Sequence, residues 1–376
     1  MREEITPRQA GIFCFLMLFS SKILALPSIL FKDAGYFAFF IIVIFLLAEI
    51  FFLYIFIKLK EKYINLSFFD ILSKFLGKIV TKIIYFLFFL YFLIALVHLI
   101  YDNFIYLRET IFEDARIERF FIIFLPVICA LAYKGLNGLA RTAEFFYIFI
   151  VIGLICCLAL GFSSVQIFTF PTFENVSFGL TFGTIFNYFF WLGDFAFFLM
   201  IIDKIKVKNG FGKTIMNYVW LGFTLLIIFY FVFYQVYKNT SFMHGSAITD
   251  IIAFTNQVGN IEKLNLIALL VVMFAIFYQG GILLYSINES FSKFVTCTNK
   301  TQNFVAYIIL TVITFLFFFY ASQKIHVMLE DYGKYLAIIL FLIIPIYLIF
   351  QLIFDKNNKN FGKKVKNEKI YKKNAK

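Results

Sequence analysis

The sequence predicts an all-α integral membrane protein in which ten transmembrane helices form two inverted repeats of five. Three observations predict this fold: an apolar composition, ten apolar blocks of membrane-spanning length, and interruptions at matching places in the first and sixth blocks. Of the 376 residues, 62% are hydrophobic and only 15% are charged. This is too little charge to coat a soluble domain of this length.

The ten blocks are separated by charged or turn-rich segments, and each block suits a hydrocarbon layer about 30 Å thick. The first is interpreted as a retained helix and not a cleaved signal peptide, because Glu3 and Glu4 accompany the basic residues before it and no A-x-A site follows. We expect spans at 9–31, 35–58, 83–107, 119–133, 143–162, 180–203, 214–237, 264–288, 304–322 and 333–354.

The distribution of basic residues supports this count of spans. If the N-terminus is cytoplasmic, most of the 34 Lys and Arg residues fall in segments that ten spans place inside, as the positive-inside rule requires. Both termini are then cytoplasmic. We expect residues 1–355 to form one transmembrane permease domain and 356–376 a basic, disordered cytoplasmic tail. We expect the segment 65–77 to form an amphipathic interfacial helix that is capped by Ser67 or Asn65.

The same sequence lacks the common sequence motifs of enzymes and metalloproteins. It contains no H-E-x-x-H motif, no Walker A sequence and no Ser/His/Asp triad signature. Its cysteines form no C-x-x-C pair, and its three histidines are far apart in the chain. We therefore expect no catalytic residues, no metal and no cofactor. The net charge of +12 is interpreted as a preference for anionic lipid and not for nucleic acid.

Ionisable residues inside spans are the first candidates for function, because the membrane interior makes them costly. Four of them lie near span ends, where we expect them to reach the interface or to pack: His98, Asp102, Glu144 and Glu289. Three lie deeper and matter more: Lys22, Glu49 and Asp194.

Two of the deep residues lie where a helix is expected to break. Lys22 lies between the serines at 20 and 21 and Pro27, which removes a backbone donor and disfavours helix at the residue before it. Asp194 follows Gly193 near the centre of the sixth span. A third weak point is Gln279, followed by two glycines, in the eighth span; these glycines permit either close packing or a cavity.

The first and sixth of ten helices occupy equivalent positions in two halves of five. Because five is odd, the second half begins on the opposite side of the membrane, which is the pattern of an inverted repeat. Such proteins bind solutes at the midplane between their broken helices. The amide groups that start each half-helix suit a carboxylate.

The chain resembles the endospore germination permease family, the B subunits of germinant receptors within the amino acid–polyamine–organocation superfamily. Four segments carry this resemblance: ITPRQ (5–9), SKILALP (21–27), GLNGLARTAE (135–144) and FWLGD (190–194). The resemblance implies a LeuT-like fold, an amino-acid germinant and the inner membrane of the spore. It also implies an A subunit and a lipoprotein C subunit as partners.

Three functions remain open at this point. The first is a permease-like subunit that binds a germinant and signals to its partners; the second is a proton-coupled secondary amino acid transporter; the third is a structural subunit without a ligand. For the first, we expect the ligand to lie between spans one, three, six and eight. Its candidate contacts are Ser20, Ser21, Lys22, Ile23, Leu24, Tyr188, Trp191, Gly193, Asp194 and Gln279.

Gating or coupling is assigned to Lys22, Glu49, Arg141, Glu144 and Asp194. Lys22 is either a fixed positive charge in place of a coupling cation or the salt-bridge partner of Asp194. Arg141 and Glu144 are spaced i,i+3 at a cytoplasmic helix start. They form either a local ion pair or an inner gate that is latched to another helix.

Overall fold

The computed structural model describes residues 4–19, 22–64, 66–110, 117–163, 165, 178–259, 265–295 and 323–354. Within these ranges the chain is helical apart from turns and one isolated β-bridge. The elements are α1 (Pro7–Phe19), α2 (Leu26–Ala34), η1 (Gly35–Phe37), α3 (Ala38–Lys62), α4 (Phe68–Thr110), α5 (Ile117–Tyr133), α6 (Gly135–Ser163), α7 (Phe178–Asn187), η2 (Phe189–Leu192), η3 (Asp194–Ala196), α8 (Phe197–Ile201), η4 (Ile202–Lys204), α9 (Phe211–Tyr237), η5 (Lys238–Met243), α10 (Ala247–Gly259), α11 (Asn265–Val295), α13 (Gln323–Ile338), the π-helical η6 (Ile339–Ile343) and α14 (Ile344–Phe354).

Six helical stretches in the described ranges are long and apolar enough to cross a membrane. They are Leu26–Lys62, Phe68–Arg108, Gly135–Ser163, Phe211–Met243, Ala268–Val295 and Asp331–Phe350. Two shorter apolar helices, Pro7–Phe19 and Phe124–Tyr133, accompany them. The prediction of an all-helical, multi-pass membrane protein is therefore confirmed. The count of ten spans and the inverted repeat stay predictions, and span 304–322 lies outside the described residues.

The outer faces of the helices carry the apolar side chains that a membrane protein exposes to lipid. On α6 the exposed residues recur at spacings of three and four, which is one helical stripe. An exposed apolar stripe of this length would be an aggregation hazard in water, whereas it is favourable against hydrocarbon. Its members are Phe145, Ile148, Phe149, Ile152 and Ile155.

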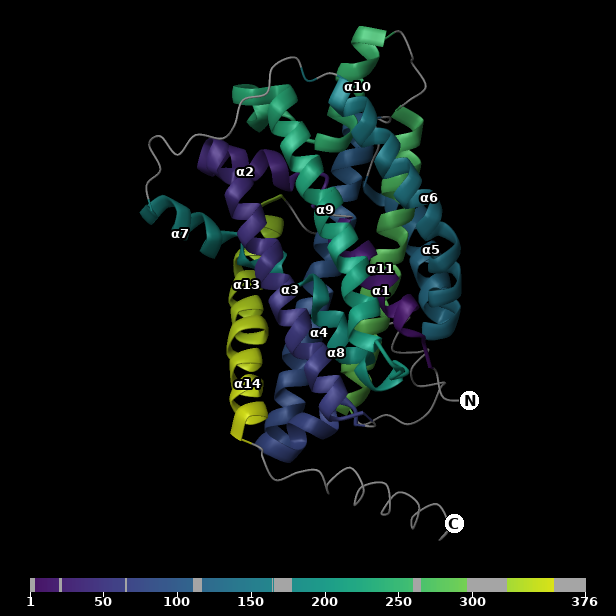
Figure 1. Ribbon diagram of the computed structural model, residues 1–376, viewed down its shortest axis with the longest axis vertical. Coiled ribbons are helices and arrows are strands. Elements are labelled where there is room, and N and C mark those ends of the chain that lie inside the picture. The colour runs from purple at the N-terminus through teal and green to yellow at the C-terminus, as the bar shows by residue number, and fades with distance from the viewer. Residues whose placement is uncertain are drawn as a thin grey trace.

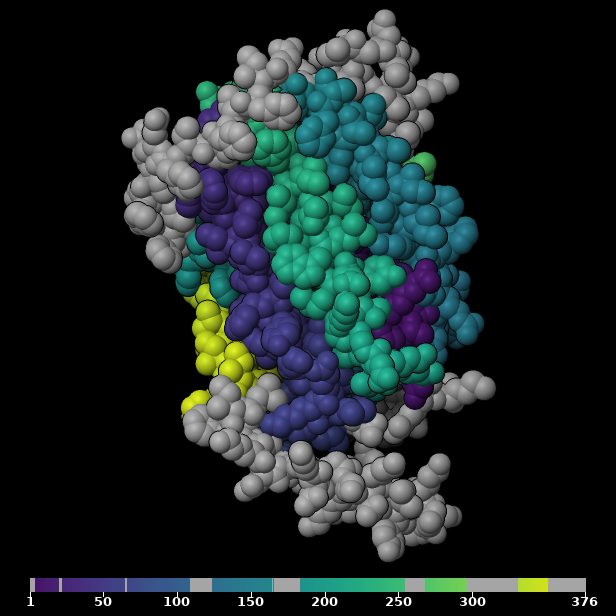
Figure 2. Space-filling model, in the orientation of Figure 1, coloured from purple at the N-terminus to yellow at the C-terminus, as the bar shows by residue number. Residues whose placement is uncertain are grey.

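Helix α1 lies inside the bundle, and almost all of its residues are buried. It packs against α9, α6 and α11, and α11 packs in turn against α4 and α5. Figure 1 shows α1 inside the bundle, and Figure 2 shows only a small part of it at the surface between α9 and α6. A helix that is apolar on every side belongs in such a position. The break that follows α1 is therefore deep in the protein.

The first part of α4 forms a helix over most of the segment 65–77, and its interfacial position stays a prediction. Ser67 Oγ accepts a hydrogen bond from the backbone amide of Asp70 (3.1 Å) and donates to the carboxylate of Asp70 (2.8 Å), which is a reciprocal cap. The helix then breaks at Gly77, whose φ of 80° only glycine adopts without strain. The alternative cap, Asn65, lies outside the described residues.

The segment before α1 is joined to the segment after η4. The amide of Ile5 donates to the carbonyl of Lys204 (2.9 Å), and the amide of Lys206 donates to the carbonyl of Ile5 (2.9 Å). These two bonds form the parallel bridge between Ile5 and Ile205. The start of the chain and the end of the second broken helix therefore lie together at one end of the bundle.

Candidate functional site

The first helix break lies where the sequence predicts it. Helix α1 ends at Phe19, residues 22–25 form a turn, and helix resumes at Leu26 with Pro27 in its first turn. Proline is tolerated there because the first amides of a helix have no intrahelical acceptor. The predicted contacts Ser20 and Ser21 fall between the two described segments and lie outside the described residues.

The second break is also found at its predicted position. Helix α7 ends at Asn187, and two 3₁₀ turns separated by Gly193 lead into α8. A Cβ atom on Gly193 would lie 1.6 Å from the hydroxyl oxygen of Tyr91, so no larger residue fits in this arrangement. The Tyr91 hydroxyl donates to the carbonyl of Phe190 (3.3 Å), and α4 thereby supports the break.

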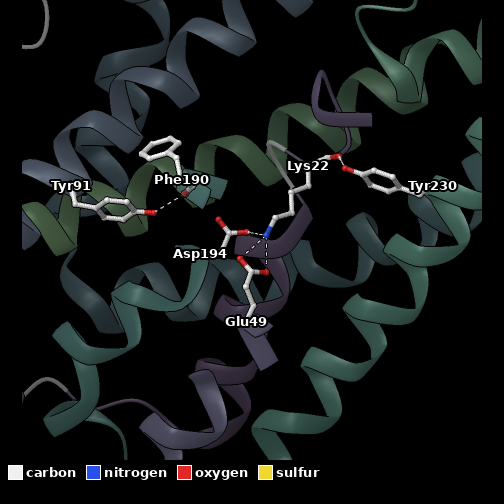
Figure 3. Close-up of polar contacts among 6 residues, drawn as sticks. All are labelled: Lys22, Glu49, Tyr91, Phe190, Asp194 and Tyr230. Atoms are coloured by element: carbon white, nitrogen blue, oxygen red, sulfur yellow. Dashed lines mark hydrogen bonds and ion pairs between the residues drawn. The ribbon is translucent and has the colours of Figure 1, made fainter. Parts of the chain in front are cut away.

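The two breaks are joined by an ion triad (Figure 3) made of Lys22, Glu49 and Asp194. Lys22 Nζ donates to Glu49 Oε1 (2.8 Å), to Glu49 Oε2 (2.7 Å) and to Asp194 Oδ2 (2.5 Å). The Lys22 and Glu49 side chains are fully buried, whereas 12% of the Asp194 side chain is exposed. Lys22 was expected to be either a fixed positive charge in place of a coupling cation or the salt-bridge partner of Asp194. The structure contains this salt bridge, and Glu49 of α3 is the third member of the cluster.

The backbone freed by the first break is satisfied by neighbouring elements. A break inside a membrane protein is tolerable only when its backbone groups find new partners. Two buried tyrosines of α9 and the first amide of α10 supply them. The bonds are Tyr230 Oη to the carbonyl of Lys22 (2.9 Å), Tyr234 Oη to the carbonyl of Pro27 (2.9 Å) and Ala247 N to the carbonyl of Leu24 (3.1 Å).

Two of the predicted carboxylate-binding residues already have backbone partners. The Ile23 amide donates to the carbonyl of Phe19 (3.3 Å), so it is not free to hold a ligand carboxylate in this conformation. The carbonyl of Leu24 accepts a hydrogen bond from the amide of Ala247 in α10. The side chains of Ile23 and Leu24 are both buried and apolar.

The predicted aromatic contacts lie on one side of the second break. The ring of Trp191 is buried and meets the ring of His98 edge to face, with centroids 4.9 Å apart. His98 Nε2 lies 3.3 Å from Asp102 Oδ2, one turn further along α4. Tyr188 donates from its hydroxyl to Asp33 Oδ2 (2.7 Å), and this bond joins the end of α7 to the last turn of α2.

Gln279 is buried in α11, and its Oε1 has no hydrogen-bond partner among the residues that the structure describes. Residue 290 is eleven positions further on, which is three helical turns, so both residues share a face of α11. The Ser290 hydroxyl on that face reaches Met200 Sδ (3.3 Å) of α8. Gln279 therefore lies on this face of α11 with an acceptor left open, and a buried acceptor without a partner is costly.

The predicted gating pair is not formed as proposed. Between the described side chains of Arg141 and Glu144 the structure has no ion pair, and Arg141 is exposed. Glu144 instead lies 3.7 Å from Arg8 Nε and accepts a hydrogen bond from Gln9 Nε2 (3.1 Å). Both partners lie at the start of α1, so Glu144 joins α6 to α1, and a gating role for this contact stays a prediction.

Sequence reasoning missed the tyrosines that support the breaks. Tyr230 and Tyr234 are spaced i,i+4 in an apolar span, a signal that one buried face of α9 carries hydroxyl donors. Tyr91 gives no such signal, because a single tyrosine in a chain with 22 of them does not stand out.

Comparison with known proteins places the chain in one family. The family model described as "Spore germination protein" matches residues 4–327, which is most of the chain. A comparison with curated proteins gives no match.

Proposed function

Because the chain belongs to the spore germination permease family, we propose that it binds a small amino-acid germinant where its two broken helices meet. Binding there shifts the equilibrium between two helix arrangements, and this shift is passed to partner subunits. The observation that carries the proposal is the ion triad, because one buried lysine holds both helix breaks and α3 together.

The chemistry around the triad suits an amino acid. Asp194 is the only accessible member of the triad, and its carboxylate is a natural partner for a ligand ammonium group. We also assign Gln279 to the site, because its open Oε1 accepts one more hydrogen. A ligand that separates Asp194 from Lys22 loosens the contact between the two breaks, and this links binding to a change in helix arrangement.

The setting of the proposal follows from the family and the charge pattern. We place the chain in the inner membrane of the spore, with both termini cytoplasmic and with an A subunit and a lipoprotein C subunit as partners. Residues 1–355 act as the permease domain, and the basic tail 356–376 lies on anionic lipid.

Binding to the purified, full-length chain tests this function. The twenty standard L-amino acids are titrated individually against the protein in lipid nanodiscs by calorimetry. We expect saturable binding of at least one of them and a loss of about tenfold or more in affinity in Asp194→Asn, since hydrogen bonds to charged groups contribute about 1.5–3 kcal/mol. Asp331→Asn is the matched control, because 59% of the Asp331 side chain is exposed and its partner Lys334 lies on the same helix. If no amino acid binds, the proposal fails.

A second function, a proton-coupled secondary amino acid transporter, is favoured by the presence of two carboxylates in the triad, since buried acidic groups serve as proton relays in transporters. Proteoliposomes separate it from sensing. Uptake of a labelled amino acid that stops when the pH gradient is collapsed would establish transport. Binding without uptake would leave sensing as the function.

A further inference from the structure

The ion triad has one positive charge too few. Lys22 contributes one positive charge, whereas ionised Glu49 and Asp194 contribute two negative ones. All three side chains lie in the protein interior, where an uncompensated charge is costly. The protein interior therefore favours a state of the triad that contains one more positive charge.

Among the residues that the structure describes, the neighbouring groups do not supply that charge. The titratable groups packed against the triad from other elements are Tyr91 of α4 and Tyr230 of α9. Each tyrosine donates its hydroxyl hydrogen to a backbone carbonyl, of Phe190 and Lys22 respectively (Figure 3). Helical segment η6 contributes the apolar ring of Phe341 beside the glycine of the second break.

The two carboxylates differ in how well their negative charge is held. Glu49 accepts two hydrogen bonds from Lys22. Asp194 has one hydrogen bond from Lys22, and it alone has exposed surface. Hydrogen bonds to the charged form favour that form. Asp194 is therefore the carboxylate on which a proton is held and from which it can leave.

We infer that the missing charge is a proton on Asp194 in the ligand-free protein, and that the ammonium group of an amino-acid ligand replaces it. On binding, the carboxyl O–H bond of Asp194 breaks, its proton passes to solvent, and the carboxylate pairs with the ligand ammonium group. The triad remains neutral in both states. The replacement of the proton by a ligand ammonium group rests on the proposed function. The presence of the proton in the ligand-free protein rests on the charge count alone.

The consequence is a defined ligand class and a built-in pH dependence. A ligand needs a cationic amine to displace the proton. A neutral or anionic analogue that lacks this amine leaves the proton on Asp194. Because binding releases a proton, the apparent affinity rises with pH until Asp194 is ionised without ligand, and it falls as the medium becomes more acidic.

Infrared difference spectroscopy of the ligand-free, full-length protein tests the proton directly through the C=O stretch of a protonated carboxyl. Neutrality predicts one such group in the wild type at pH 7. Glu49→Gln removes one negative charge, so the Asp194 band disappears although the Asp194 carboxyl is still present. Asp194→Asn also removes the band. Lys22→Met removes the only cation, so the band grows. Asp331→Asn, in an exposed pair, leaves the band unchanged.

Each result decides the inference. Loss of the band in both carboxamide variants supports it. A wild type without the band overturns it, and so does a band that Glu49→Gln leaves intact, since the proton would then not depend on charge balance. Glu49→Gln keeps the size of the side chain and leaves a neutral pair, and the amide bands of the same spectra report whether the helices persist.

Calorimetry in two buffers of different ionisation enthalpy tests the exchange. For any amino acid that binds, we expect one proton released per molecule bound in the wild type and none in Glu49→Gln. Binding without proton release would refute the exchange and leave the proposed function standing. Absence of all binding would refute the proposed function, while the infrared series would still decide whether the triad holds a proton.

Discussion

Lys204 Nζ lies 2.6 Å from Glu289 Oε2, so an ion pair joins the end of the second broken helix to α11. Each side chain is only 17% exposed, and the same ammonium group reaches the hydroxyl of Tyr285 (2.5 Å). Glu289 was expected to reach the interface from a span end, and it is instead engaged inside the protein. Because the Ile5 bridge adds the start of the chain to this contact, three segments close one end of the bundle together.

Removing the Lys204–Glu289 pair should loosen this end of the bundle. In Glu289→Gln we expect backbone amides of 4–6 and 204–206 to exchange with deuterium about 5- to 30-fold faster, which corresponds to a loss of 1–2 kcal/mol. Mass spectrometry of the exchanged peptides provides the measurement. Lys58→Met is the control, because it removes an exposed pair with Glu61, and such pairs contribute little. Equal exchange in both variants would contradict the account.

Tyr230→Phe should destabilise the first helix break. The carbonyl of Lys22 loses its hydrogen-bond donor, and a buried acceptor without a partner costs about 1–3 kcal/mol. We expect a lower midpoint of thermal unfolding in detergent. Tyr335→Phe is the control, because Tyr335 is 53% exposed and surface changes are usually within about 0.5 kcal/mol. A midpoint for Tyr230→Phe that matches this control would show that the bond is dispensable.

Gly193→Ala should be among the least tolerated small substitutions. Its Cβ would overlap the Tyr91 hydroxyl and the ring of Phe341, and overpacking of a dense core costs about 1–3 kcal/mol or more. Gly183→Ala in α7 is the matched control, since an added Cβ there meets nothing within 4 Å. We expect the first variant to lower the unfolding midpoint and the second to leave it unchanged or raise it. A partial recovery of Gly193→Ala by Tyr91→Ala would identify the clash as the cause.

Glu144→Gln and Arg141→Gln should behave differently although the two positions are three residues apart. The first removes the carboxylate that holds Arg8 and Gln9, whereas Arg141 is exposed. Spin labels on α1 and α6 report their separation, and we expect a broader distance distribution in Glu144→Gln only. If both variants broaden it equally, the two residues act as the local pair that the sequence also allowed.

Local rules made both helix breaks predictable. Pro27 acts through its own backbone, so its effect does not depend on which helices surround it. Gly193 marked the second break as a position tolerant of unusual dihedrals, and the structure adds that a larger residue there would meet Tyr91 of α4. The costly charges at Lys22, Glu49 and Asp194 were equally visible, because the membrane makes any buried charge stand out.

What the sequence left open depends on packing between distant segments. Whether Glu144 would pair with Arg141 or with another helix was undecided, because an i,i+3 spacing permits a contact without requiring it. The donors from Tyr91 and Tyr230 come from residue types that are common in this chain, and only the fold shows which carbonyl each one meets. Glu49 could be identified as a candidate, but its place between the two breaks required the structure.

The measurement that tests the central claim most directly is the ratio of affinities for an amino acid and for its 2-hydroxy-acid analogue. The amino acid is whichever binds most tightly to the wild type, and both compounds are titrated against the wild type and Asp194→Asn. If the ligand amine pairs with Asp194, the wild type prefers the amine by about ten- to a hundredfold, and this preference falls to about onefold in the variant. An equal preference in both proteins would show that Asp194 does not hold the ligand amine, and the site would then lie elsewhere.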